Sequence, residues 1–328
     1  MERPCLSVII PIFNEEQVIE LLYQRLTDMA AGLGVSYEFV FVNDGSRDRS
    51  LELLKHIAST DPRVRVLDFS RNFGHQVAIT AGMDYSQGEA VVVIDADLQD
   101  PPELIGLMLE KWREGYDVVY AVREKREGDT LFKRVTAALF YRTLKRITNV
   151  DIPLDTGDFR LMSRRAIEAM RLVRERNRFV RGLVSWIGFR QTGIRFVRAE
   201  RYAGETKYPL KKMLRFAADG IVSFSFIPLQ LATFFGFLAS GMSFVGILWV
   251  IYLRLFTDET ITGWASLMVI MLFLGGVQLL TLGIVGEYIG RIYDEVKQRP
   301  LYLVQELFGF DPKGETEPRT ENSRRSSP

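Results

Sequence analysis

Two long apolar runs in the carboxyl-terminal third restrict this chain more than any other feature. Residues 229–255 and 264–289 each exceed the roughly 20 residues that a helix needs to cross about 30 Å of hydrocarbon. A buried core helix can also be apolar all round, but two such runs, nearly adjacent, are unusual in a soluble core. The sequence therefore predicts a two-helix transmembrane hairpin.

The charges around the two runs predict their orientation. The connection between them, FTDETITG, carries acids but no Lys or Arg. Basic residues precede the first run and follow the second: Lys211, Lys212, Arg215, Arg291, Lys297 and Arg299. The sequence thus predicts a multi-pass protein of the inner (plasma) membrane. By the positive-inside rule, we expect both termini and the residues before the hairpin to lie in the cytoplasm. We expect 290–310 to be a cytoplasmic segment and the polar stretch 311–328 to be a disordered tail.

Composition excludes several classes of protein. The net charge of +1 does not favour nucleic-acid binding, and no signal peptide precedes the first strand-like segment. A single cysteine, Cys5, excludes an internal disulfide bond. With only His56 and His75 present, a bound divalent ion would need oxygen ligands.

Residues 1–208 read as a soluble α/β domain. Five short apolar, strand-like segments alternate with helical ones, which predicts a Rossmann-like, mostly parallel sheet with helices on both faces. The strand-like segments are LSVIIPIF, YEFVFVND, RVRVLDFS, EAVVVIDAD and YDVVYAVRE. Ligands of such sheets collect beyond the carboxyl ends of the strands, where the polar clusters FNEE, NDGSRD and DADLQD fall.

Asp95 and Asp97 follow the apolar run VVVI. Two carboxylates at a strand end are costly to place together unless a cation or hydrogen bonds hold them. A Mg²⁺ or Mn²⁺ ion that also binds diphosphate oxygens would do so, with Gln99 as a nearby polar ligand. The alternative is a capped turn in which Asp97 and Asp100 accept backbone N–H groups.

Other polar residues at strand ends have both an ordinary and a functional interpretation. Asp44 could form an Asx-turn with Gly45 or accept hydrogen bonds from a nucleotide base or ribose. Gly74 and His75 could be ordinary helix capping. The residues after the first strand could meet a uracil and a ribose or only cap the next helix: Pro11, Phe13, Asn14 and Glu15.

Seven blocks, in one order, resemble the family 2 glycosyltransferases of GT-A fold, and more narrowly the polyisoprenyl-phosphate glycosyltransferases. They are VIIPIFNEE, VNDGSRDRS, SRNFGHQVAITAG, IDADLQDPPE, TGDFRLM, GETKYP and GEYIGRIYDEVKQRPLYLV. The phage-type undecaprenyl-phosphate glucosyltransferase branch is most similar, through TGDFRLM, RNRFVRGLVSWIGFRQ and the second apolar run.

The resemblance implies a metal-dependent, inverting transfer of a hexose, with glucose from UDP-glucose leading, to polyisoprenyl phosphate. It implies nucleotide-sugar binding by Pro11, Phe13, Asn14, Glu15, Asp44, Asp95, Ala96 and Gln99. It implies a metal site at Asp95, Asp97 and Gln99, and catalytic roles for Asp97, Asp158 and Lys207. It implies acceptor-phosphate binding by Arg123, Arg134 and Arg201.

The chemistry of the acceptor limits what Asp158 has to do. A phosphate monoester has a second pKa of about 6 and is already mostly ionised at neutral pH, so a general base is less necessary. We therefore interpret Asp158 as a positioning or proton-handling group, while the metal ion and Lys207 would neutralise the departing UDP.

Two basic amphipathic segments, 131–149 and 209–228, favour contact with an anionic membrane surface over packing on the protein alone. Other sugar donors stay open, as do the chain length of the lipid and the oligomeric state, for which a homo-oligomer is one option. A processive polysaccharide synthase is disfavoured because the QxxRW block is missing. A non-catalytic scaffold is disfavoured by the intact Asp44, Asp95, Asp97 and Lys207.

Overall fold

The computed structural model describes residues 4–123, 156–196, 227–256 and 263–310. The chain divides into two compact units. The first contains a sheet with its covering helices and takes up the chain again from Arg299 onward. The second contains two long helices.

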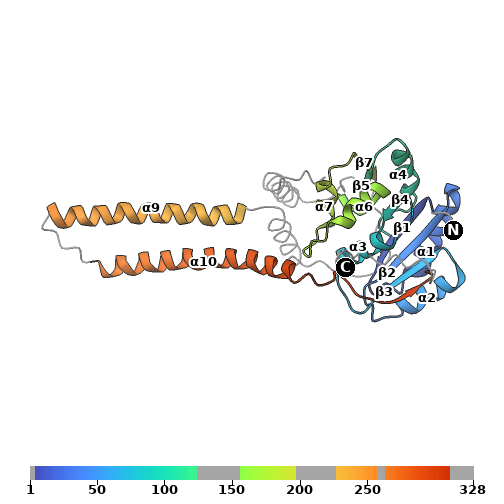
Figure 1. Cartoon of the computed structure of the whole chain (residues 1–328), viewed down its shortest axis with the longest axis horizontal. Coiled ribbons are helices and arrows are strands. Elements are labelled where there is room, and N and C mark those ends of the chain that lie inside the picture. Colours follow the sequence, from blue (N-terminus) through green and yellow to red (C-terminus); the bar gives the residue numbers. More distant parts are fainter. Residues whose placement is uncertain (1–3, 124–155, 197–226, 257–262, 311–328) are drawn as a thin grey trace, which may run out of the picture. The chain divides into compact units, whose positions relative to one another are not determined.

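Within the described residues, eight strands form one sheet in the order β7-β5-β6-β4-β1-β2-β3-β8 (Figure 1). β1 pairs in parallel with β2 and β4, β2 pairs in parallel with β3, and β5 with β7. β6 is antiparallel to both β4 and β5, and β8 is antiparallel to β3. The predicted mostly parallel sheet is confirmed, with two antiparallel strands that the sequence analysis did not place. The strands are β1 (Leu6–Ile12), β2 (Tyr37–Asn43), β3 (Val64–Phe69), β4 (Ala90–Val93), β5 (Val118–Arg123), β6 (Thr156–Ser163), β7 (Gln191–Phe196) and β8 (Val304–Phe308).

Helices cover both faces of the sheet, as predicted. Consecutive residues of β1 show the two faces: Ile10 lies in the core cluster shared with α1, α2 and α4, whereas Ile9 meets Gly82 of α3. A Cβ atom on Gly82 would lie 2.1 Å from Ile9 Cγ2, so α3 can approach β1 this closely only with glycine there. The helices of this unit are α1 (Ile19–Leu33), α2 (Ser50–Thr60), α3 (His75–Tyr85), α4 (Leu104–Arg113), α6 (Arg164–Leu172) and α7 (Val180–Trp186).

Pro11 lies inside the central strand β1, where a proline is normally excluded. The pairing of β1 with β4 ends at Ile9, whose carbonyl oxygen accepts from Ile94 N at 3.0 Å. Pro11 is two residues further along β1, so its backbone N is directed to the same side as the Ile9 carbonyl, toward β4. At this point β4 no longer pairs with β1. Its missing N–H therefore breaks no hydrogen bond, and β1 and β4 separate at their carboxyl ends.

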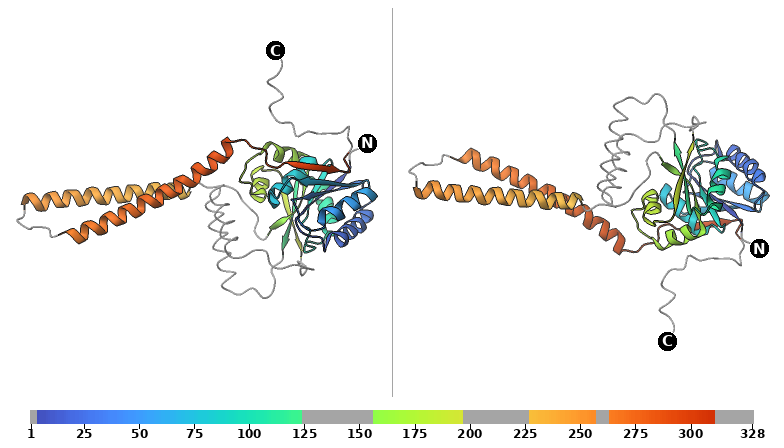
Figure 2. Two further views of the ribbon diagram at one scale, coloured as in Figure 1. Left: turned by 90° about the horizontal axis from the view of Figure 1, so that it is seen from below. Right: turned by 90° about the horizontal axis from the view of Figure 1, so that it is seen from above.

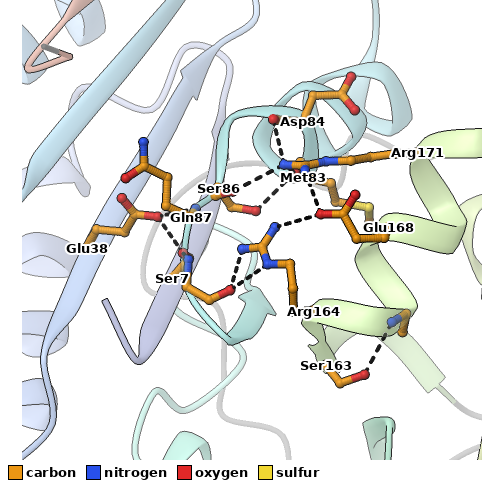
Figure 3. A network of polar contacts seen from close by, with 12 residues as sticks. Ser7, Glu38, Met83, Asp84, Ser86, Gln87, Ser163, Arg164, Glu168 and Arg171 are labelled. Atoms are coloured by element: carbon orange, nitrogen blue, oxygen red, sulfur yellow. Dashed lines mark hydrogen bonds and ion pairs between the residues drawn. The ribbon is translucent and has the colours of Figure 1, made fainter. Parts of the chain in front are cut away.

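A buried polar network ties the strands together at the opposite, amino end of the sheet (Figure 3). Glu38, 2% exposed, accepts from Ser7 Oγ and, at 2.7 Å, from Gln87 N. Ser7 Oγ in turn accepts from Gly88 N at 2.7 Å, and Arg164 Nε donates to Gly88 O at 2.9 Å. Arg65 Nη1 lies 3.0 Å from Glu38 Oε2 and balances its charge. Because these partners all lie at the end of the sheet opposite the polar strand ends, the buried Glu38 belongs to the framework of the sheet.

The chain returns to the sheet after the apolar helices, which the predicted division at residue 208 did not anticipate. β8 pairs with β3, and Lys55 Nζ lies 2.9 Å from Glu306 Oε2. Tyr302 stacks on Phe69 with ring centroids 5.3 Å apart, and its hydroxyl donates to Asp84 Oδ2 at 2.8 Å. Residues 299–310 are therefore part of the first unit.

The second unit consists of α9 (Ile227–Phe256) and α10 (Trp264–Val296), which run alongside each other (Figures 1 and 2). Among the described residues, Phe273–Val296 is long and apolar enough to cross a membrane, and Ala232–Gly246 is a shorter apolar helical stretch. Large apolar side chains are exposed on both helices, such as Phe237 on α9 and Leu280 on α10. The two helices include the predicted spans, and α10 continues past residue 289.

Several predicted segments lie outside the described residues. They are the amphipathic segment 131–149, residues 209–226 of the predicted juxtamembrane helix, the hairpin connection 257–262 and the tail 311–328.

Candidate active site

Those predicted site residues that the structure describes lie at the carboxyl edge of the parallel strands. From β1 the strand order runs to β2 and β3 on one side and to β4 on the other, and ligands of doubly wound sheets bind at such a switch point. Asn14 follows β1, Asp44 follows β2, and Asp95 follows β4. Because β6 is antiparallel, its beginning reaches the same edge. The pairing of Val93 with Arg160 continues to place Asp158 opposite Asp95.

Asp158 is the centre of a polar cluster and is nearly buried, with 5% of its side chain exposed. Arg181, at the start of α7, donates from Nε to Oδ1 at 2.8 Å and from Nη2 to Oδ2 at 3.1 Å. Gln76 Nε2 donates to Oδ2 at 3.3 Å. His75 Nε2 lies 3.3 Å from Asp158 Oδ2 and 3.4 Å from Asp95 Oδ1, so it bridges the two carboxylates.

This clustering shifts the pKa values of its members in opposite directions. Burial alone would raise the pKa of Asp158, but the charge of Arg181 and the hydrogen bond from His75 hold it well below its ordinary value. Burial raises the pKa of Asp95, and the neighbouring Asp158 and Asp97 raise it further against the effect of His75. Burial would lower the pKa of His75, but its contacts with Asp158 and Asp95 raise it overall. The cluster therefore favours an ionised Asp158 beside cationic partners.

The loop after β4 turns sharply and presents Asp97 next to Asp95. Leu98 adopts a left-handed backbone conformation with φ 57°, and Asp97 Oδ1 accepts from Gln99 N at 3.2 Å. Asp97 therefore caps this turn, as the alternative interpretation predicted for it. Asp97 and Gln99 are nonetheless half-buried rather than enclosed, whereas Ala96 is buried.

Asp95 and Asp97 fit a divalent ion that a ligand helps to hold. The described part of the chain contains no group of three or more His, Cys, Asp and Glu residues that could hold a metal ion on its own. Asp95 Oδ1 is buried without a hydrogen bond, and His75 is its nearby cation. Mg²⁺ binds through one or two carboxylates and completes its shell with water and substrate phosphates, so this donor set is suitable once a diphosphate is present.

The loop after β1 is fastened to the loop after β2. Asn14 has a φ of 54°, donates from its backbone N to Ser46 Oγ at 3.0 Å, and accepts from Arg47 N at 2.8 Å. Glu15 N donates to Ser50 Oγ at 3.0 Å. Of the residues predicted to meet the nucleotide here, Pro11 is buried inside β1 and Phe13 is 39% exposed. Phe13 is thus an accessible aromatic ring at this edge.

Asp44 is directed at the backbone of a neighbouring loop. Its carboxylate accepts from Phe73 N at 2.6 Å and from Gly74 N at 3.0 Å, and its carbonyl oxygen accepts from Asn72 Nδ2 at 3.1 Å. Burial raises the pKa of Asp44, and the two backbone amides oppose that rise. Asp44 thereby anchors the loop that leads into His75, a role that the sequence analysis did not foresee.

Three residues of the cluster were not predicted as site residues. His75 and Gln76 begin α3, and the sequence analysis considered His75 only as capping. Arg181 begins α7, in the RNRFVRG stretch that was noted only for its resemblance. The signal that could have identified them is the presence of polar residues at helix starts that face the carboxyl edge of the sheet.

The predicted basic residues are hardly tested by the structure. Arg123 is the last residue of β5, paired in register with Phe196 of β7. Arg134, Arg201 and Lys207 lie outside the described residues.

A mostly parallel sheet with helices on both faces, an antiparallel strand beside β4 and paired carboxylates at the carboxyl edge of the sheet are typical of GT-A type sugar transferases. The family profile named Glycosyl transferase family 2 matches residues 7–171. "Uncharacterized glycosyltransferase YkcC" of Bacillus subtilis is 61% identical over 94% of this chain and 95% of its own length. "SfII prophage-derived bactoprenol glucosyl transferase" of Shigella flexneri is 43% identical over 94% of this chain and 99% of its own length.

The chain therefore belongs to glycosyl transferase family 2 and is a transferase enzyme. Among solved structures, glucosyl-3-phosphoglycerate synthase from Mycobacterium tuberculosis, in complex with Mn²⁺, UDP and phosphoglyceric acid, aligns with a TM-score of 0.44 and 19% identity. That alignment covers 66% of this chain and 75% of the other.

Proposed function

We propose that this enzyme transfers glucose from UDP-glucose to the phosphate of a polyisoprenyl lipid such as undecaprenyl phosphate. The transfer inverts the anomeric carbon and requires Mg²⁺ or Mn²⁺. The product is a lipid-linked phosphosugar that donates its sugar in modification of a cell-envelope glycan.

One observation carries this proposal: a relative named as a bactoprenol glucosyl transferase matches 94% of the chain, including both apolar helices. The match therefore covers the polar cluster around Asp95 and Asp158 as well as the apolar helices suited to a lipid environment. The apolar stretch Phe273–Val296 is what an enzyme with a membrane-embedded acceptor needs. The carboxylates of Asp95 and Asp97 are what a nucleotide diphosphate with its metal ion needs.

The residues would divide the work between donor and acceptor. Asp95 and Asp97, with Gln99, would hold the ion, and Phe13, Asn14 and Glu15 lie where the nucleoside would enter. The metal ion, when bound, supplies positive charge that stabilises the departing diphosphate. Lys207 would add to this charge.

On the acceptor side, Arg123, Arg134 and Arg201 would bind the lipid phosphate, whose ionised oxygen attacks the sugar. Asp158 would position groups around this phosphate, because an acceptor that is already ionised needs no strong base.

We further propose that α9 and α10 both cross the inner membrane and that both termini are cytoplasmic. The basic residues flanking the two helices and the acidic connection between them support this orientation.

The function is tested with purified enzyme in detergent, labelled donor sugars and undecaprenyl phosphate. We expect transfer from UDP-glucose in the presence of Mn²⁺, with less from UDP-galactose and GDP-mannose. Undecaprenol, which has the same tail without the phosphate, is the matched control acceptor. Comparable transfer to the free alcohol, or no transfer to the lipid phosphate from any of these donors, would contradict the proposal.

A further inference from the structure

The carboxylate of Asp158, on β6, is surrounded by donors from two helices, α3 and α7. Arg181 of α7 reaches both of its oxygens, at 2.8 and 3.1 Å. Gln76 and His75, the first residues of α3, lie 3.3 Å from Oδ2. A carboxylate offers about four lone-pair positions, so these donors occupy most of its capacity as an acceptor. Asp158 is thus held in one orientation.

Gln76 also connects the two helices that carry these donors. Its Oε1 accepts from Val180 N, at the start of α7, at 2.9 Å, while its Nε2 donates to Asp158. Val180 directly precedes Arg181, so the hydrogen bond from Val180 N fixes the position of the backbone from which the Arg181 side chain extends. The chain therefore aligns α7 on α3 and both on β6 through one amide side chain.

We propose that Arg181 is a positioning residue for sugar transfer, which acts through Asp158 and is itself aligned by Gln76. In this arrangement Arg181 holds the Asp158 carboxylate in one orientation, beside His75 and Asp95. This inference rests on the proposed function, since the oriented Asp158 would organise the acceptor phosphate. Arg181 is not a catalytic residue, because its contact is with Asp158.

The same chain contains a comparable ion pair away from the cluster around Asp158. Arg174 makes two hydrogen bonds to Asp84 at 2.7 and 3.0 Å, and the Asp84 side chain is 4% exposed, against 5% for Asp158. The two arginines are also comparably exposed, 39% for Arg174 and 29% for Arg181. Asp84 lies in the last turn of α3, whereas Asp158 contacts its first turn. Arg174→Gln therefore removes an equivalent ion pair without touching the site.

The experiment compares kcat, the KM for UDP-glucose and the apparent melting temperature for wild type, Arg181→Gln, Arg181→Lys and Arg174→Gln. Charge-assisted hydrogen bonds of this kind predict a fall in kcat of about ten- to hundredfold for Arg181→Gln, with a nearly unchanged donor KM. Arg181→Lys keeps the charge but cannot donate two parallel bonds, so we expect it to recover part of kcat. Arg174→Gln should lower the melting temperature while kcat stays within about twofold of wild type.

Two further variants separate positioning from simple structural support. In an Asp158→Asn background, Arg181→Gln should lower kcat by no more than about threefold, because its route to the reaction is already lost. Gln76→Glu keeps an acceptor for Val180 N but places a second carboxylate beside Asp158, so it should lower kcat in a folded protein. This variant remains informative if Arg181→Gln does not fold.

Three results would overturn the proposal. They are an Arg181→Gln enzyme with kcat within twofold of wild type, multiplicative losses in the double variant, and equal losses of kcat in Arg181→Gln and Arg174→Gln. Failure of the proposed function looks different, because wild type itself would then transfer nothing to the lipid phosphate. In that case the same variants are compared by their rates of UDP-glucose hydrolysis, and the same criteria apply.

Discussion

Replacing Asp44 by Asn tests whether this residue is a nucleotide ligand or the anchor of a loop. In the structure its two carboxylate oxygens accept from Phe73 N at 2.6 Å and Gly74 N at 3.0 Å. Asparagine can keep the bond from Phe73 N, without its charge, but it turns an amide NH₂ toward Gly74 N–H. Weakening one charge-assisted bond and losing another costs about 1–3 kcal/mol of unfolding free energy, after allowing for easier desolvation of the amide.

A loss of this size corresponds to a fall of roughly 2–12 °C in the apparent melting temperature of a domain of about 200 residues. Burial raises the pKa of Asp44 above its ordinary value of 3.8. The stabilisation from this carboxyl is therefore complete below that value and is lost as the pH rises through the folded pKa. The difference between wild type and Asp44→Asn should accordingly be larger near pH 4 than at pH 7.

The assay is thermal unfolding in detergent at both pH values, with UDP titrations alongside. Asp48→Asn is a suitable control on the same loop, since Asp48 accepts from Glu16 N and Ser50 N rather than from the loop before α3. A melting temperature within 1 °C of wild type, combined with at least tenfold weaker UDP binding, would refute the anchor and favour direct contact with the nucleotide.

Three other outcomes are expected. Asp97→Asn should abolish transfer in a folded protein and EDTA should do so reversibly, whereas near-normal turnover of the variant with saturating Mn²⁺ would show that the metal assignment is wrong. A cysteine at Glu259, in a Cys5→Ser background, should react with an impermeant thiol reagent on intact cells; labelling only after lysis would reverse the orientation of the hairpin. Asp61→Asn should destabilise the enzyme at pH 7 by about 1–3 kcal/mol, because Asp61 accepts from Tyr23 and Arg63. Burial raises the pKa of Asp61 but these bonds lower it overall, so wild type should lose this advantage as the pH falls below 3.8, and a constant difference down to pH 2 in denaturation curves would contradict it.

The sequence by itself determined the features that depend on local pattern. The apolar runs predicted the two long helices, because the length of an apolar segment can be counted in the sequence without knowing what the segment contacts. The five strand-like segments and the polar residues behind them placed Asn14, Asp44, Asp95 and Asp97 at one edge of the sheet. That inference needed only the rule that parallel strands end together, and the structure confirms it.

Only the tertiary structure decided which side chains meet at that edge. Asp158 lies near Asp95 because β6 pairs antiparallel with β4. The two strands are distant in the sequence, and the hydrophobic periodicity of neither strand predicts that they pair. Arg181 lies on a helix of seven residues, too short to give a clear amphipathic pattern, and it finds Asp158 only through the packing of α7. The direction of the Asp44 carboxylate and the pairing of β8 with β3 were equally undetermined. In each case the contact depends on how segments distant in the sequence pack against each other. The local sequence supplies the residues but does not indicate which of them come into contact.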